Sequence, residues 1–283
     1  MAYILVTNDD GVDAPGLLAL KTALDQMGEV VVFAPDHNWS VAGHTRIMHK
    51  PLRVGQVRLL DGTMAYTTTG TPSDCVALAV LGILPRKPDL VVSGINLGAN
   101  VGQDLTYSGT VSAAMEGVIN GIPSFAVSLD TYQDGDFSYA AQFASRLAST
   151  VLEKGLPPGT FLNVNVPNVP ATEICGVQVT RLGKRVYRDV LIERQDPQGR
   201  NYYWIGGEPP TGVLEEGTDI WALAHNCVSI TPLHLDMTAY RLLEEMRGWE
   251  FRNKLEPGEW AVSYTHLRAH ETPEHLVCRL LLE

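Results

Sequence analysis

The chain has 283 residues, of which 45% are hydrophobic and 19% charged, and its net charge is −11. This balance supports a folded core and excludes the basic surface that a general nucleic-acid-binding protein needs. No apolar run is long enough to span a membrane. We therefore expect neither a nucleic-acid polymer nor a membrane as a partner.

The cysteines are far apart in the sequence and form no CxxC pair: Cys75, Cys175, Cys227 and Cys278. This pattern is typical of free thiols in a reducing compartment. Because the first residues also lack the features of a signal peptide, the sequence predicts a cytoplasmic protein.

The chain opens with a short apolar run at 3–7, followed by Asn-Asp-Asp-Gly at 8–11 and an amphipathic run from Pro15. We predict a buried strand, a turn and a helix. In a parallel α/β sheet, the carboxyl end of a strand is where ligands bind. Asp9 and Asp10 are adjacent carboxylates there, and they repel each other unless a cation binds. A hard divalent cation is the simplest partner.

Strands and helices then alternate up to residue 166. The expected strands are at 30–34, 90–94, 124–128 and 161–166, the helices at 72–84, 111–120 and 137–152, and β-hairpins lie within 46–69. Thr71 and Asp74 form a capping box for the second helix. The order predicts a doubly wound, mainly parallel, Rossmann-like α/β sheet in a core domain of residues 1–180. No GxGxxG follows the first strand, which excludes a dinucleotide-binding fingerprint.

After this core, strands and helices no longer alternate regularly. The expected elements are strands at 177–187 and 200–205, a turn at Gly206-Gly207, a strand from 227 that Pro232 stops, and a closing helix at 238–249.

We assign residues 181–258 to a β-rich oligomerisation arm with this closing helix, because exposed aromatic residues in long hairpins indicate packing on another subunit. The alternative is an extension of the chain's own sheet. Residues 259–283 resemble read-through from cloning DNA, so we interpret them as a non-native tail.

Three predicted strand ends bring oxygen donors to one edge of the sheet. Asp9 and Asp10 follow the first strand, Ser40 lies in the loop after the second, and Asn96 follows the strand at 90–94. Two carboxylates, a hydroxyl and an amide oxygen suit one divalent cation per subunit, Mg²⁺ or Mn²⁺, with Ca²⁺ as a substitute in crystals. The set contains no His or Cys, which argues against zinc.

Ser108, Gly109 and Thr110 open a helix at the same edge. Helix N-termini present unpaired N–H groups and a partial positive charge, which suit phosphate. We assign substrate binding to these three residues together with Ser40 and Asn96.

A cation beside an anion-binding helix end predicts hydrolysis of a phosphate monoester by metal-activated water. The catalytic residues are then Asp9, Asp10 and Asn96. An aspartyl-phosphate intermediate on Asp9 or Asp10 is the alternative mechanism.

Motifs between about residues 1 and 250 form one joint pattern. In the first half of the chain they are residues 4–11 and 14–16, residues 34–35 and 38–40, the GTPSDCV tract at 70–76, and residues 93–117. In the second half they are residues 216–219, residues 228–233 and Asp236. Together they resemble the SurE (survival protein E) nucleotidases. Many members have a basic residue where this chain has Trp39, which leaves substrate preference open.

The resemblance implies a 5′-nucleotidase, often also a 3′-nucleotidase, that acts on nucleoside monophosphates. It implies a divalent metal held by Asp9, Asp10, Ser40 and Asn96. It also implies homodimers or homotetramers that form by exchange of C-terminal arms.

Three other classes remain to be separated from this one. A receiver-like phosphotransfer domain needs an Asp where this chain has Asn96, and a haloacid-dehalogenase-type phosphatase needs Asp-x-Asp instead of adjacent acids. The non-enzymatic alternative is a metal-stabilised assembly protein built on the arm.

Overall fold

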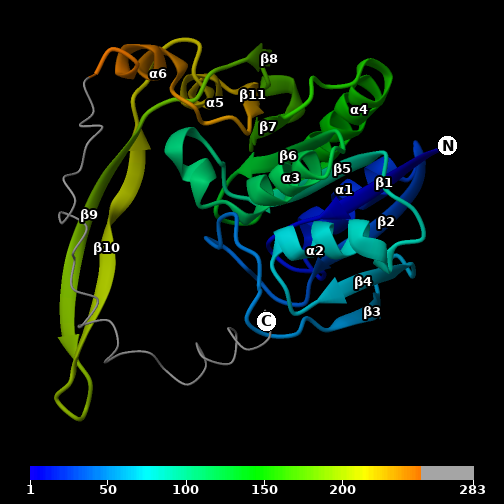
Figure 1. Cartoon of the computed structure of the whole chain (residues 1–283), viewed down its shortest axis with the longest axis horizontal. Helices are drawn as coiled ribbons and strands as arrows, with labels where there is room; N and C mark the ends of the chain where they lie inside the picture. Colours follow the sequence, from blue (N-terminus) through cyan, green and yellow to red (C-terminus); the bar gives the residue numbers. More distant parts are fainter. Residues whose placement is uncertain (250–283) are drawn as a thin grey trace, which may run out of the picture. The chain divides into compact units, whose positions relative to one another are not determined.

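The computed structural model describes residues 1–249 (Figure 1). The chain divides into two compact units, Met1–Asp236 and a second that begins at Met237, and each is described by itself. Within the described residues, no helix is both long enough and apolar enough to cross a membrane.

The first unit is built on a nine-stranded sheet with the order β3-β4-β2-β1-β5-β6-β7-β11-β8. Its strands are β1 (Ala2–Thr7), β2 (Gly28–Pro35), β3 (Val54–Arg58), β4 (Met64–Thr68), β5 (Leu90–Leu97), β6 (Ser124–Asp130), β7 (Thr160–Pro167), β8 (Gly176–Val179) and β11 (Cys227–His234). In the order of the sheet, neighbouring strands are parallel from β4 through β2, β1, β5 and β6 to β7. The pairs β3–β4 and β7–β11 are antiparallel. The predicted doubly wound, mainly parallel sheet is confirmed.

The strand order reverses at β1. The chain passes from β1 to its neighbour β2, and later returns to place β5 on the other side of β1. In open α/β sheets the crevice at such a switch point, outside the carboxyl ends of the strands, is where ligands bind. The topology therefore points to the ends of β1 and β5.

Helices cover both faces of the sheet (Figure 1). On one face α1 (Pro15–Leu24) and α4 (Ser138–Lys154) share an apolar core, and on the other α2 (Pro72–Leu78) packs beside α3 (Gly109–Ile119). Small residues let α3 approach the sheet closely, since a Cβ added at Gly117 would meet the Ser124 hydroxyl oxygen at 2.2 Å. Shorter helical segments are η1 (Ala79–Ile83), η2 (Gly102–Thr106), η3 (Ala171–Glu173) and α5 (Asp219–Ala224).

The predicted capping box of α2 is confirmed, but the helix is shorter than expected. The Thr71 hydroxyl accepts from the Asp74 N–H at 3.1 Å, and the Asp74 carboxylate accepts from the Thr71 N–H at 3.0 Å. Regular α-helix ends at Leu78 instead of continuing to 84. The chain continues as the π-helical segment η1, in which Gly82 has φ +125°, a backbone conformation that interrupts a right-handed helix.

The strands β9 (Arg185–Gln195) and β10 (Asn201–Gly212) form a separate two-stranded antiparallel sheet. Figure 1 shows this hairpin extending away from the nine-stranded sheet. The alternative, that the chain after the core packs on its own sheet, is therefore wrong for β9 and β10 but right for β8 and β11. The strand expected at 177–187 is divided between β8 and β9. The turn expected at Gly206-Gly207 is also wrong, because both glycines pair across to β9.

The proline in β11 does not stop that strand. β11 continues to His234, and Pro232 pairs with Leu162 of β7. On the other side, pairing with β8 ends at Ile230. At Pro232, β11 therefore has β7 as its only neighbouring strand. On the side where β8 has ended there is no strand to pair with, so the N–H that proline lacks costs no hydrogen bond there.

The second unit contains α6 (Tyr240–Met246), within the expected helix at 238–249. The predicted non-native tail, 259–283, lies outside the described residues.

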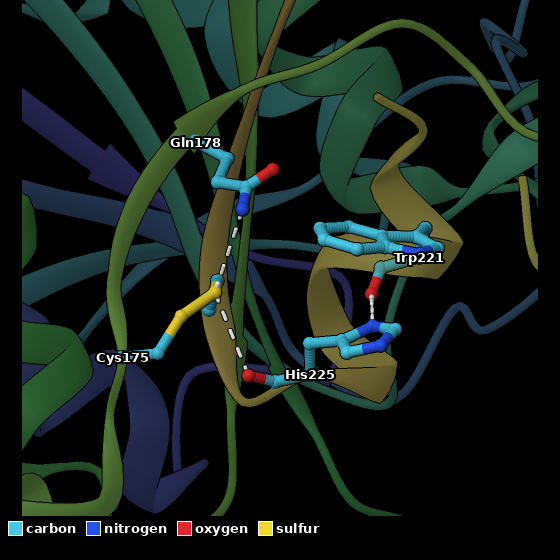
Figure 2. The surroundings of a disulfide bond; sticks show 5 residues. Cys175, Gln178, Trp221 and His225 are labelled. Carbon is cyan, nitrogen blue, oxygen red and sulfur yellow. Dashed lines mark hydrogen bonds between the residues drawn. A yellow bond between two sulfur atoms is a disulfide. The ribbon is translucent and has the colours of Figure 1, made fainter. Parts of the chain in front are cut away.

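The expectation of free thiols throughout is wrong. Figure 2 shows a disulfide between Cys175 and Cys227, whose Cα atoms are 5.0 Å apart. The two are 52 residues apart in sequence, and only the pairing of Gly176 in β8 with Cys227 in β11 brings them together. Among the described cysteines, Cys75 is free and buried.

Candidate active site

The first half of the site is the turn that follows β1. Asn8 is fully buried, and its amide nitrogen donates to the Gly11 carbonyl at 2.9 Å. Gly11 has φ +101°, a conformation that favours glycine. Asn8 and Gly11 thus shape the turn, and the turn presents the two carboxylates between them.

Asp9 lies against the N-terminus of α3. Its side chain is 4% exposed and accepts a hydrogen bond from the Thr110 hydroxyl. Burial raises the pKa of Asp9 to about 6; the Thr110 hydrogen bond opposes this rise, and the neighbouring charge of Asp10 adds to it. A Cβ added at Gly109 would lie 2.7 Å from the Asp9 Cβ and 2.9 Å from its Oδ2. Only glycine at this position lets the helix end pack this closely on the carboxylate.

Ser108 is the N-cap of α3, and its hydroxyl accepts from the Val111 N–H at 3.1 Å. Ser108 lines the pocket described below. Gly109 and Thr110 instead pack against Asp9. The predicted phosphate-binding tract therefore reaches the pocket through Ser108 and fixes Asp9 through its other two residues.

Asp10 contacts the other two strand ends. Its carboxylate accepts from the Leu97 N–H and from the Asn38 amide, each at 3.4 Å. Burial raises its pKa, against the effect of the Leu97 hydrogen bond. Asp10 lines a small hollow of about 380 Å³ together with Ile95 and Phe137. Leu97 lines both this hollow and the larger pocket described below, so the two are adjacent.

Ser40 and Asn96 come from the loop after β2 and from the end of β5. The Ser40 hydroxyl and N–H both donate to the Asn38 amide oxygen at 2.6 Å. The Asn96 amide nitrogen donates to the Gly98 carbonyl at 2.7 Å. This bond leaves the Asn96 amide oxygen as the group that can bind a ligand.

A pocket of about 400 Å³ joins most of these groups. It is lined by Asp9, Ser40, Val41, Asn96, Leu97, Gly98, Ala99, Asn100, Asp104, Tyr107, Ser108, Tyr132 and Pro210. Of the seven residues predicted from the sequence, Asp9, Ser40, Asn96 and Ser108 line this pocket, while Asp10, Gly109 and Thr110 do not.

Three residues that line this pocket were not predicted from the sequence: Asp104, Tyr132 and Pro210. Tyr132 follows β6 by two residues, so the rule about strand ends could have found it. Asp104 lies in η2 and Pro210 in β10, and no pattern in the sequence links either to β1.

The donor set fits a hard divalent cation. It consists of carboxylate, hydroxyl and amide oxygens, and burial disfavours the charged form of Asp9, a cost that a bound cation would offset. Within residues 1–249, no group of three or more His, Cys, Asp or Glu is placed so that it could hold a metal ion. A site here thus depends on the hydroxyl and amide donors as well as the two acids.

A doubly wound sheet, paired acids at its switch point and a helix N-terminus against one of them define a Rossmann-like α/β enzyme of phosphate chemistry. Comparison with known proteins gives the same result. The family model described as Survival protein SurE matches residues 4–189. The chain therefore belongs to the SurE family, as the motifs predicted.

Similar proteins extend the match over most of the chain. The 5′-nucleotidase SurE of Chloroflexus aggregans is 56% identical over 251 residues, covering 88% of this chain and 99% of that protein. The 5′-nucleotidase SurE of Herpetosiphon aurantiacus is 58% identical, covering 83% and 93%. The crystal structure of the SurE protein from Aquifex aeolicus superposes with a TM-score of 0.76 at 45% identity, covering 87% of this chain and 98% of that one.

Proposed function

We propose that this chain is a metal-dependent 5′-nucleotidase, a phosphoric monoester hydrolase that converts nucleoside 5′-monophosphates to nucleoside and phosphate. The observation that carries the proposal is the buried Asp9, which faces a pocket together with Ser40, Asn96 and the N-cap residue Ser108. The relatives named 5′-nucleotidase SurE support it at 48–58% identity.

The protein residues have separate roles in this proposal. Asp9, Asp10, Ser40 and Asn96 hold one Mg²⁺ or Mn²⁺, and when bound the cation supplies a Lewis acid for the phosphoryl group. The Ser108 hydroxyl hydrogen-bonds to a phosphoryl oxygen, and the positive end of the α3 dipole behind it stabilises the growing charge.

The nucleoside occupies the outer part of the same pocket. Tyr107 and Tyr132 line it, and each residue is more than half exposed, at 59% and 73%. Aromatic faces accept any nucleobase by stacking. We therefore propose broad base tolerance. Activity on 3′-monophosphates is proposed from the family resemblance alone.

Hydrolysis of a panel of nucleoside 5′- and 3′-monophosphates, with EDTA and then Mn²⁺ or Mg²⁺ added back, tests this function. We expect activity to disappear with EDTA and return with the metal. The Asp10→Ala variant should lose activity but keep its fold and mass. Activity that is indifferent to EDTA, or that survives in Asp10→Ala, would contradict the proposed metal site.

We also propose that the hairpin β9–β10, as part of the arm at 181–258, mediates dimer or tetramer formation by arm exchange. Its exposed large apolar side chains are Tyr187, Val190, Leu191, Ile192, Tyr202, Tyr203, Trp204 and Ile205. So extensive an apolar surface on a two-stranded hairpin is typical of a protein interface.

Light scattering tests this assembly. The wild type should have at least twice the mass of one chain, and Trp204→Asp with Ile205→Asp should reduce it. A wild-type mass equal to that of one chain would refute the proposal. A cytoplasmic location stays a prediction, and the Cys175–Cys227 disulfide removes one of the arguments for it.

A further inference from the structure

Residues 36–53 connect β2 to β3 without regular structure, and we call the first part of this connection, residues 36–50, the Ser40 loop. Ser40 itself is exposed on it. Val41, the next residue, has φ +63°, a conformation that is strained for a β-branched residue. Such strain costs about 1–3 kcal/mol and persists only where the surrounding structure holds the backbone in place.

Two backbone hydrogen bonds hold the loop close to the site. The Trp39 N–H donates to the Asp9 carbonyl at 2.7 Å, and the Gly43 N–H donates to the Tyr107 carbonyl at 2.9 Å. They fix the backbone on both sides of Ser40 and Val41. Their partners lie in the turn after β1 and just before α3.

A buried acid of α3 holds the next residue of the loop. Glu116 is 3% exposed, and its Oε2 accepts from the His44 Nε2 at 2.9 Å. Burial acts to raise the pKa of Glu116, but the His44 hydrogen bond and the charge of Arg46 outweigh it and lower the pKa. Glu116 is therefore ionised at neutral pH, and His44 donates to a charged acceptor.

A second buried acid fixes the loop where it leaves the site. Asp74 accepts from the Ile47 N–H at 3.2 Å, and the Thr71 hydroxyl donates to the Thr45 carbonyl at 2.6 Å. The capping box of α2 thus also anchors the Ser40 loop. This explains why the GTPSDCV tract belongs with the site although it contributes nothing to the pocket lining.

We infer that Glu116 and His44 are positioning residues, which hold the Ser40 loop so that Ser40 stays beside Asp9 and Asn96. Neither residue lines the pocket, so they act through the loop backbone. Burial of the Glu116 carboxylate is weak evidence for a stabilising role, because desolvation disfavours its charged form. Fixing the loop is therefore the stronger reason for a buried acid at this point. The inference rests on the proposed metal site.

Direct measurement of Mn²⁺ binding, by calorimetry without substrate, tests the inference. Residues that orient metal ligands typically change metal affinity by about 10–100-fold when they are replaced. We expect Glu116→Ala and His44→Ala each to weaken Mn²⁺ binding by at least about tenfold. Glu116→Gln keeps an acceptor for the His44 N–H and should restore most of the affinity.

Asp61→Asn is the matched control. Asp61 is in an ion pair with the buried Lys21 at 2.6 Å, between α1 and the turn of the β3–β4 hairpin. This change should lower the unfolding temperature without changing Mn²⁺ affinity, which separates loss of stability from loss of positioning.

The outcomes are distinguishable. If the wild type binds no Mn²⁺, the metal site and this inference both fail. If the wild type binds Mn²⁺ but His44→Ala binds it equally well, only this inference fails. His44 is partly exposed, with 31% of its side chain accessible, so this variant is expected to fold even if Glu116→Ala does not.

Discussion

Replacement of Asp9 by asparagine should make the metal-free protein more stable at neutral pH while abolishing activity. The Asp9 carboxyl is buried, and its pKa rises from 3.8 to about 6 on folding. At 1.36 kcal/mol per pKa unit, this rise corresponds to about 3 kcal/mol of destabilisation once the group is ionised. Asparagine has nearly the same shape, still accepts from the Thr110 hydroxyl, and carries no charge.

The direction of the pH effect follows from proton binding. Between about pH 4 and pH 6 the folded state holds the Asp9 proton while the unfolded state has lost it. Stability of the wild type therefore falls as pH rises through this window. The stability difference between Asp9→Asn and the wild type should grow by about 3 kcal/mol over the same range and then stay constant.

Urea unfolding in EDTA at several values between pH 4 and pH 7.5 measures this difference. Other titrating groups cancel because both proteins contain them, apart from Asp10, whose charge is coupled to that of Asp9. Adding Mn²⁺ should stabilise the wild type alone, by about 2.7 kcal/mol at one hundred times the dissociation constant. If the free energy of unfolding changes with pH equally in the two proteins, Asp9 does not carry a buried charge and the prediction is refuted.

Two further predictions concern packing and charge. Gly109→Ala adds a methyl group 2.7 Å from the Asp9 Cβ, so we expect kcat/KM for a nucleoside 5′-monophosphate to fall by about 100-fold, the usual effect of displacing a reacting group by about 1 Å. Gly55→Ala, whose new methyl would meet an ordinary contact at 3.7 Å, is the control, and equal kcat/KM in both variants would contradict the expected clash. Asp61→Asn removes one of the two carboxylates that bind the buried Lys21, and urea unfolding at pH 7 should show a loss of about 1–3 kcal/mol. Because the pKa of Asp61 is lowered to about 2, this loss should shrink as pH falls from about 4 toward 2, and a loss that is constant with pH would contradict the ion pair.

Apolar periodicity was enough to predict the core strands and the helices, because a buried parallel strand must be apolar on both faces. Thr71 and Asp74 likewise specify a helix start from local hydrogen bonding alone. The early end of α2 has a local cause in Gly82, whereas the errors in β10 and β11 fall where distant segments decide the outcome. Pro232 remains within a strand because β8 ends early beside it, and Gly206 and Gly207 remain in β10 because β9 pairs with them.

The sequence by itself determined the fold class and the family, and it predicted the four oxygen donors Asp9, Asp10, Ser40 and Asn96. Strand ends in a parallel sheet share one edge, so their order along the chain is enough to bring them to one region. Only the tertiary structure decided the details of the site. It packed Gly109 and Thr110 against Asp9 and placed Asp10 beside the pocket.

The tertiary structure also decided features that depend on segments far apart in the chain. It joined Cys175 to Cys227 and connected His44 to Glu116 across 72 residues. These contacts depend on which side chains meet when separate elements pack, and no local pattern in the sequence records that.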